Sequence, residues 1–371
     1  MVPAAERGTS RSGSSPHGSA FVSSPRAHAG LECKSGNAAA SGDTTRATMD
    51  GSPSDSAADV ENRSGGTKAR AFIIGVGLMG GSLAMALRAS GRYEVNGFDV
   101  NPASLRRAAA LGALDRTADS LSDAREADIV VVATPLLAMP QVFSELGRCL
   151  RDRDARRSRD LPVVTDVGSA KCYVLALARE HLAPAVPFVG GHPMTGSEVS
   201  GVEHASANMM SGCLYVLTPA EWTGETAVRT VVRACETAGA VPRIMDPADH
   251  DAMVAATSHL PLIIAACLAQ VVEGRSVDRP CIWDLAAGGF RDTTRLSSGD
   301  PDMGTGMLTA NATQVLEAMD EFQRKFDEVR GLLAASAQAP AAPRAAEVRR
   351  FLVQARRARQ AWLERTRFPV V

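Results

Sequence analysis

The sequence of 371 residues has no excess of either charge, because 40 lysine and arginine residues are balanced by 41 aspartate and glutamate residues. A near-neutral chain lacks the broad positive field that most nucleic-acid and anionic-membrane binders use, so we expect a small-molecule partner and no nucleic acid. Long hydrophobic runs are also missing. The most apolar stretch, residues 260–272, is interrupted by Pro261 and Gln270, and we therefore expect no membrane span.

Paired cysteines are absent as well. The seven cysteines are an odd number, lie far apart and form no CxxC pair. This pattern favours apolar residues of a reducing compartment over a disulfide framework or a zinc site. We expect a cytoplasmic protein without a bound metal.

Large apolar residues are scarce in residues 1–68, where Phe21 and Leu31 are the main exceptions in a background of Ser, Gly, Ala and Arg. Such a segment cannot bury a core, and we predict a disordered tail. Two other interpretations stay open. The tail resembles an organellar transit peptide in composition, although acids such as Glu6 and Asp50 argue against it, and Met49 is an alternative start.

From residue 69 onward, short apolar runs alternate with helical patterns, as in AFIIGVG followed by a helix over 80–89. This βαβ alternation predicts an α/β fold with a Rossmann-type, doubly wound, mostly parallel sheet over residues 69–247. Further strands are expected in the segments YEVNGFDV, DIVVVATP, LPVVTDVG, PFVGGHP, LYVLTP and VPRIMDP.

Strand signals stop after Pro247, and residues 248–333 predict an all-helical domain with long helices over 248–272 and 303–333. Pro261 is expected to kink the first helix. The second has a broad apolar face that one small domain cannot cover alone, so we expect a homodimer formed through these helices. Residues 334–371 are expected to form a linker and a basic amphipathic helix.

A dinucleotide fingerprint, GVGLMG over residues 75–80, lies directly between a strand and a helix, with Asp99 closing the next strand. Glycines permit a tight turn and a close approach to a pyrophosphate, and the helix N-terminus offers free N–H groups. Asp99 is expected to bind the ribose hydroxyls and to repel a 2′-phosphate, which favours NAD over NADP. The expected cofactor-binding residues are Gly75, Gly77, Leu78, Met79, Gly80, Asp99, Thr134 and Pro135.

Polar or conformationally special residues follow three predicted strands, at 134–135, 166–171 and 190–193. Open α/β sheets bind their ligands at this edge. A residue before proline is biased to extended geometry, so we place His192, which precedes Pro193, in a strand-end loop. An imidazole there is the side chain best suited to take a proton near neutral pH.

The helical half offers two more polar groups, His259 beside Pro261 and the segment GGFRDTTR over 288–295. Glycines followed by arginines suggest a loop that delivers a guanidinium to a carboxylate. The alternative, that Arg291 or Arg295 only pairs with Asp292 on the surface, is equally compatible with the sequence.

The ordered motifs GxGLMGGSLA, TDVGSAK, GGHPMTGSE, SHLP and GGFRDTTR resemble those of the prephenate and arogenate dehydrogenase family over residues 70–330. The resemblance implies a Rossmann domain, a helical dimerisation domain, and NAD-dependent oxidative decarboxylation of prephenate or arogenate in tyrosine biosynthesis, with prephenate favoured. It implies that His192 is the catalytic histidine, that Ser169 supports it, and that Arg295 binds the substrate carboxylate. It also places Ser197, Glu198 and His259 in the substrate pocket.

The chain departs from the family at Gly304, where many relatives carry a bulky residue. The residues after 333 are too few and too basic for a regulatory domain or a fused chorismate mutase. Two other functions are considered. A β-hydroxyacid dehydrogenase would use a lysine in the helical domain, yet residues 246–324 contain none. A non-catalytic NAD-sensing protein would require His192 and Arg295 to be incidental.

Overall fold

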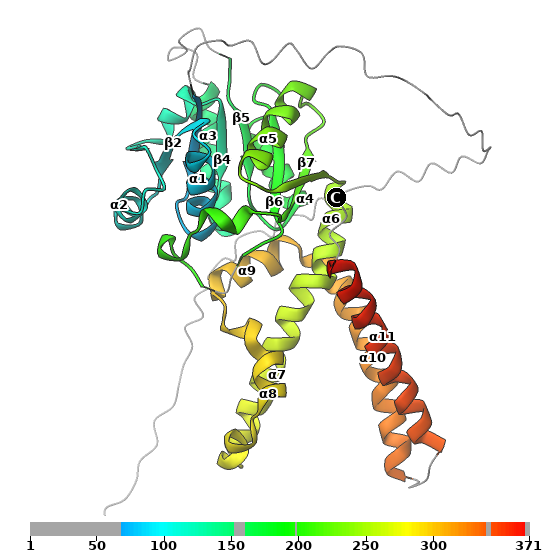
Figure 1. The fold of residues 1–371 in the computed structure, drawn as a ribbon. Helices are drawn as coiled ribbons and strands as arrows, with labels where there is room; N and C mark the ends of the chain where they lie inside the picture. The colour runs from blue at the N-terminus through cyan, green and yellow to red at the C-terminus, as the bar shows by residue number, and fades with distance from the viewer. Residues whose placement is uncertain (1–67, 152–159, 197–198, 339–342, 368–371) are drawn as a thin grey trace, which may run out of the picture. The chain divides into compact units, whose positions relative to one another are not determined.

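The computed structural model describes residues 68–151, 160–196, 199–338 and 343–367 (Figure 1). The predicted disordered tail, except for Lys68, lies outside these residues, and so do Ser197 and Glu198.

Within the described residues, eight strands form one sheet in the order β3-β2-β1-β4-β5-β6-β7-β8. All neighbouring strands are parallel except β6 and β7, which are antiparallel. The first six follow the doubly wound order that reverses between β1 and β4, where such sheets bind dinucleotides. The predicted α/β class is therefore confirmed. The strands are β1 (Ala69–Ile74), β2 (Tyr93–Phe98), β3 (Arg116–Thr117), β4 (Ile129–Val132), β5 (Val163–Asp166), β6 (Phe188–Pro193), β7 (Leu214–Pro219) and β8 (Val241–Ile244).

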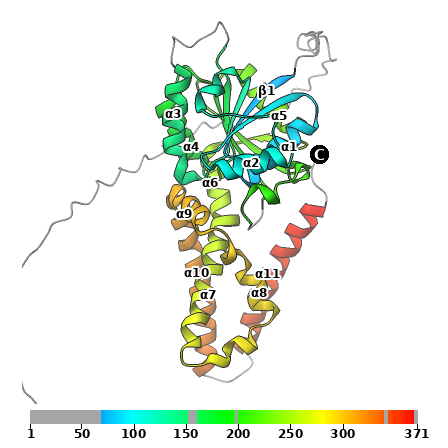
Figure 2. The same ribbon diagram turned by 90° about the vertical axis from the view of Figure 1, so that its left-hand side faces the viewer.

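Helices cover both faces of this sheet, α1 and α5 one face and α3 and α4 the other (Figures 1 and 2). Alternate residues of β1 enter the two cores: Ile73 packs in the α1/α5 core, and Phe72 packs in the α3/α4 core. Burial on both faces explains why the strands are continuous apolar runs. The helices of this part are α1 (Leu78–Ala89), α2 (Pro102–Ala110), α3 (Met139–Arg151), α4 (Lys171–His181) and α5 (Glu225–Thr237).

The chain after β8 is helical, as predicted. Its helices are α6 (Pro247–Val254), α7 (Leu260–Ser276), α8 (Gly288–Thr294), α9 (Pro301–Ala310), α10 (Ala312–Gln338) and α11 (Pro343–Arg367). A π turn, Ala255–His259, joins α6 to α7 directly before Pro261. Proline lacks the N–H that would bond to the carbonyl four residues earlier, so the irregularity expected at Pro261 takes the form of this wider turn.

The single helix predicted over 303–333 is wrong, because the chain breaks at Asn311 between α9 and α10. The Asn311 side chain donates its Nδ2 hydrogen to the Asp251 carbonyl at 2.8 Å. This hydrogen bond connects α6 to the chain at the break between α9 and α10. Helix α10 then continues to Gln338, so the boundary expected at residue 333 falls inside a helix.

Candidate active site

The glycine loop joins β1 to α1 as the fingerprint predicts. Gly75 has a φ of +90°, a conformation that L side chains rarely adopt. A Cβ added at Gly80 would lie 1.9 Å from the Gly75 carbonyl oxygen, so this close helix-to-strand contact requires glycine. Gly77 is the N-cap of α1 and makes no side-chain cap bond, and Leu78 and Met79 begin the helix. The first turn of α1 therefore has no side chain that competes with a phosphate for its N–H groups.

Asp99 lies directly after β2 and is bonded to the glycine loop. Its Oδ2 accepts the Val76 N–H at 2.9 Å, and its Oδ1 accepts the Asn101 N–H at 2.8 Å. The carboxylate is thus fixed beside the loop that would hold a pyrophosphate. This position suits a ribose, and the role assigned to Asp99 stays a prediction.

Thr134 and Pro135 follow β4 on the other side of the strand-order reversal. The Thr134 methyl group would lie 3.1 Å from a Cβ at Gly75, so the two loops are in contact. The Thr134 hydroxyl is buried, and no partner for it is found among the described residues. A buried hydroxyl without a partner is costly unless a ligand binds it. Together with the uncapped α1, this fits a bound dinucleotide.

His192 lies inside β6, not in the predicted loop, and it pairs with Val216 of antiparallel strand β7. Pro193 requires an extended backbone at His192, and a β-strand meets this requirement as well as a loop does. His192 still lies at the carboxyl end of β6. It therefore lies at the same sheet edge as the glycine loop and Thr134, because β1, β4 and β6 run in one direction.

Behind His192 lies a buried ion pair that the sequence argument missed. Lys171 Nζ donates to Asp166 Oδ2 at 2.6 Å and to the Gly191 carbonyl at 2.6 Å, and both side chains are fully excluded from solvent. Asp166 Oδ1 accepts the Gly191 N–H at 2.9 Å. These bonds fix the backbone next to His192. One local sign of these bonds is a lysine at the start of a helix that follows a buried strand.

The second missed group is the pair His250 and Asp251 on α6. His192 Nδ1 lies 2.8 Å from His250 Nε2, and His250 Nδ1 lies 2.7 Å from Asp251 Oδ1. His250 and Asp251 are almost completely buried. Ser169, the expected support of His192, lies on the loop before α4. Among the described residues, the hydrogen-bond partner found for the His192 ring is His250 and not Ser169.

The surroundings of His192 favour its neutral form. Burial lowers its pKa well below 6.5, and the positive charge of Lys171, followed by His250 and His259, lowers the pKa further. A neutral imidazole can accept a proton, and an imidazolium cannot. The site therefore keeps His192 ready to act as a base near neutral pH.

His259 lies in the π turn and is completely buried. Its Nδ1 lies 3.3 Å from Asn311 Nδ2, and its Nε2 has no partner among the described residues. Burial lowers its pKa, and Asp251 opposes that shift. A buried ring nitrogen without a partner fits the predicted role in substrate binding.

Arg295 begins a 3-10 turn at the end of α8, so the loop predicted for residues 288–295 is wrong. Gly288 and Gly289 do not interrupt the helix, since they occupy its first turn. Arg295 is exposed to solvent, and its binding of the substrate carboxylate stays a prediction. The neighbouring Arg291 Nε pairs with Asp292 at 2.9 Å.

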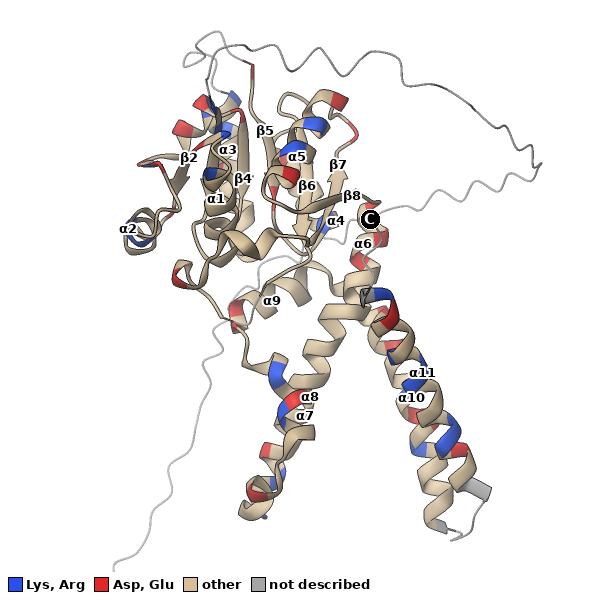
Figure 3. Ribbon diagram, in the orientation of Figure 1, with Lys and Arg blue, Asp and Glu red and all other residues tan. Residues whose placement is uncertain are grey.

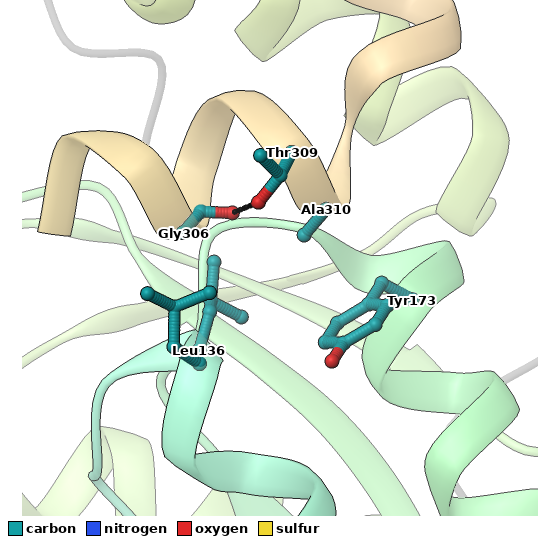
Figure 4. Close-up of a pocket in the computed structure, with 6 residues that line it drawn as sticks. Leu136, Tyr173, Gly306, Thr309 and Ala310 are labelled. Atoms are coloured by element: carbon teal, nitrogen blue, oxygen red, sulfur yellow. Dashed lines mark hydrogen bonds between the residues drawn. The ribbon is translucent and has the colours of Figure 1, made fainter. Parts of the chain in front are cut away.

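A pocket of about 220 Å³ lies between α9, the 3-10 turn before α3 and the start of α4 (Figure 4). None of the predicted site residues lines it, and it is small for a cofactor with a substrate. Its lining residues are Leu136, Leu137, Tyr173, Gly306, Thr309 and Ala310. Gly304 also lies on α9, where an added Cβ would meet only Leu262, at 3.4 Å. A Cβ at this position would therefore make an ordinary van der Waals contact.

Two family models match the chain in the order of its two structural parts. Residues 83–243 match the prephenate dehydrogenase nucleotide-binding domain, and residues 246–341 match the prephenate dehydrogenase dimerization domain. The first match covers most of the sheet. The second begins one residue before α6.

Individual proteins show the same similarity. The prephenate dehydrogenase of Bacillus subtilis is 34% identical over 261 residues, which cover 70% of this chain and 68% of that protein. The crystal structure of Aquifex aeolicus prephenate dehydrogenase in complex with hydroxyphenyl propionate and NAD+ has a TM-score of 0.70 at 29% identity, covering 80% of this chain and 98% of that one. Synechocystis arogenate dehydrogenase has a TM-score of 0.65 at 29% identity, covering 79% and 99%.

Proposed function

The chain belongs to the prephenate dehydrogenase family of NAD-dependent oxidoreductases, and we propose that it converts prephenate to 4-hydroxyphenylpyruvate in tyrosine biosynthesis. One observation supports this activity above the others. His192, a base kept neutral by burial and Lys171, lies at the sheet edge that carries the glycine loop. A proton acceptor next to a nicotinamide site is what oxidation of an alcohol requires.

The reaction defines what the residues must do. Prephenate carries a hydroxyl at C4 and a carboxylate at C1 of a dienyl ring. Loss of a hydride from C4 lets carbon dioxide leave as the ring becomes aromatic, which makes the step effectively irreversible. NAD, when bound, accepts that hydride. His192 accepts the hydroxyl proton, and Ser169 contacts the same hydroxyl from the loop before α4.

Substrate binding is assigned to residues of the helical half. Arg295 offers a planar fork to the substrate carboxylate, and His259 offers its unpaired Nε2. Ser197 and Glu198 lie outside the described residues, and their place in the substrate pocket stays a prediction from the family resemblance. The cofactor is assigned to Gly75, Gly77, Leu78, Met79, Gly80, Asp99, Thr134 and Pro135.

Arogenate is the second candidate substrate, because Synechocystis arogenate dehydrogenase has a similar structure. The two substrates differ only in a keto or amino group on the side chain, and one pocket residue can decide between them. A β-hydroxyacid dehydrogenase is disfavoured by the lack of lysine in residues 246–324. A non-catalytic NAD-sensing protein would have no use for the base at His192.

The match to a dimerization domain supports a homodimer, which we assign to α7 and α10. Among the described residues, the segment Pro247–Ser276 is long and apolar enough to cross a membrane by length and composition alone, a test that core helices of soluble proteins also pass. Figure 3 shows few charges along α7, whereas both signs occur along α10 and α11. We assign the apolar surface of α7 to the subunit interface. The six described cysteines are free, in keeping with the cytoplasmic location we propose.

The test is a direct assay. The full chain is incubated with NAD and either prephenate or arogenate, and NADH formation is followed by absorbance. We expect turnover with prephenate and a slower reaction with arogenate, and His192→Asn is the matched control, which should lower turnover roughly 10²- to 10⁴-fold. A strong arogenate preference would reverse the substrate assignment, and no NADH with either substrate would overturn the proposal.

A further inference from the structure

We propose that His250 and Asp251 are positioning residues that fix the tautomer of His192, leaving its Nε2 free to accept the proton of the substrate. The catalytic role of the two residues rests on the proposed function, whereas the hydrogen bonds that set the tautomer rest on the geometry alone. Asp251, His250 and His192 form one hydrogen-bonded chain, with steps of 2.7 Å and 2.8 Å. It joins α6 to β6, which are distant in sequence.

The directions of the hydrogen bonds follow from the Asp251 carboxylate. Its Oδ1 accepts the Lys171 N–H at 2.7 Å, and its Oδ2 accepts the Cys172 N–H at 2.9 Å. A carboxylate can only accept, so His250 Nδ1 must donate its hydrogen to Asp251. In a neutral His250 the other ring nitrogen, Nε2, is then an acceptor. His192 Nδ1 must carry the hydrogen of that bond, and His192 Nε2 carries the lone pair.

The same chain accounts for the charge that the reaction creates. When His192 Nε2 takes the hydroxyl proton, the new positive charge lies next to Lys171, which disfavours it. The His250 ring shares this positive charge through its bond to His192 Nδ1, and the negative charge of the Asp251 carboxylate stabilises it. The charged and titratable groups around His192 are thus Lys171 with Asp166, His250 with Asp251, and His259.

The orienting pair is held by groups of α4 and α6 and by Asn311. Asp251 caps the N-terminus of α4 through the N–H groups of Lys171 and Cys172. The Asp251 carbonyl accepts from Asn311, which lies between α9 and α10. His250 lies on α6 and has almost no room to rotate, because only 1% of its surface is exposed. The tautomer of the base is therefore set by two residues of α6.

The first test reads the tautomer directly. Nitrogen-15 NMR of the full chain with labelled histidine, assigned with His192→Asn, distinguishes a protonated ring nitrogen from a bare one. At pH 7.5 and without substrate we expect His192 to show a protonated Nδ1 and a bare Nε2. A protonated Nε2 in the wild-type protein overturns the proposal. Because no substrate is present, this result is independent of the proposed function.

The second test separates positioning from a structural role. In His250→Leu the acceptor for His192 Nδ1 is lost, and we expect the bare Nε2 signal to be lost and kcat to fall by roughly 10²-fold, with KM for NAD within about threefold. In His250→Gln a side-chain oxygen can still accept, so the tautomer and most of kcat should return. His181→Leu, at the far end of α4, is the matched histidine control.

Four outcomes decide between the alternatives. Recovery by Gln but not by Leu, with the tautomer following activity, supports the proposal. An unchanged kcat in His250→Leu overturns it. If His250→Leu fails to fold, the wild-type spectrum and His250→Gln still decide, since a Gln variant that folds normally, keeps the tautomer and yet loses activity also overturns the proposal. Absence of turnover in every variant, with the expected wild-type tautomer, would instead reject the substrate assignment.

Discussion

Lys171 and Asp166 form an ion pair of 2.6 Å from which solvent is fully excluded, and the same Lys171 ammonium holds the Gly191 carbonyl next to His192. Burial lowers the Lys171 pKa, and Asp166 opposes this shift. A buried pair of this kind costs much desolvation, so its main effect is seen when one partner is removed.

We expect Lys171→Met to lower the free energy of unfolding by roughly 3–5 kcal/mol, because it leaves the Asp166 carboxylate buried without its cation. Urea unfolding of both proteins measures the difference. Arg179→Met is the matched control on the same helix, since Arg179 pairs with Glu221 in solvent and should change stability by less than about 1 kcal/mol. Equal effects of the two variants would contradict the role assigned to burial.

The low pKa values of His192 and His259 predict a loss of stability in acid. In the folded protein both pKa values lie below the ordinary 6.5, so the unfolded chain binds more protons below that pH. The stabilisation is present above pH 6.5 and decreases as the pH falls through 6.5 toward the folded values. Urea unfolding at pH 7.5 and 5.5 tests this, and His192→Asn and His259→Asn should each reduce the difference. A larger stability at pH 5.5 would contradict the shifts.

The same pKa shift predicts that kcat/KM does not decline near pH 6.5. A free histidine would lose its base function there, whereas His192 should stay neutral to a clearly lower pH. The measurement is kcat/KM for prephenate against pH at saturating NAD. An acidic limb centred at 6.5 would mean that His192 is exposed to solvent in the working enzyme, or that another group is the base.

The preference for NAD should depend on Asp99. Its carboxylate would face a 2′-phosphate, and neither Val100 nor Asn101 offers a positive charge. We expect a large preference for NAD over NADP in kcat/KM, reduced by at least about tenfold in Asp99→Asn, which keeps an oxygen for the Val76 N–H. A similar kcat/KM of the wild-type protein with NAD and with NADP would contradict the role assigned to Asp99.

Arg295→Ala should mainly weaken substrate binding. Loss of a charge-assisted contact of about 2 kcal/mol raises KM for prephenate roughly 30-fold, while NAD affinity and thermal stability change little. Arg295→Lys should recover part of the loss, since lysine keeps the charge but not the planar fork. Arg291→Ala serves as control, because Arg291 pairs with Asp292. If Arg295→Ala instead lowers Tm with KM unchanged, Arg295 is structural and Arg291 becomes the candidate.

The nucleotide-binding half could be predicted from the sequence because its signals are local. The glycine loop, the apolar strands and Asp99 lie within about thirty residues, and each is recognised by its immediate neighbours. The reversed direction of β7 could not be predicted in this way. It depends on pairing between β6 and β7 across a connection whose described residues form no α-helix.

The surroundings of His192 were missed for the same reason. His250 and Asp251 follow β8 far along the chain, and no local pattern links them to His192 or to the start of α4. The break at Asn311 was also missed, because a helical apolar pattern continues across it. At the break the Asn311 side chain bonds to the Asp251 carbonyl, a contact that only the folded chain provides.

The π turn between α6 and α7 determines the angular phase of the residues on either side of it. In a regular α-helix each residue advances about 100°, so His250 and His259, nine positions apart, would point to opposite sides. Bonds that span five residues make the turn Ala255–His259 wider, and each of its residues advances by a smaller angle. Asn311 can therefore bond both the Asp251 carbonyl, beside His250, and the His259 ring. If this turn became regular α-helix with all of its residues retained, His259 would rotate away from the site, even with every side chain of the site present.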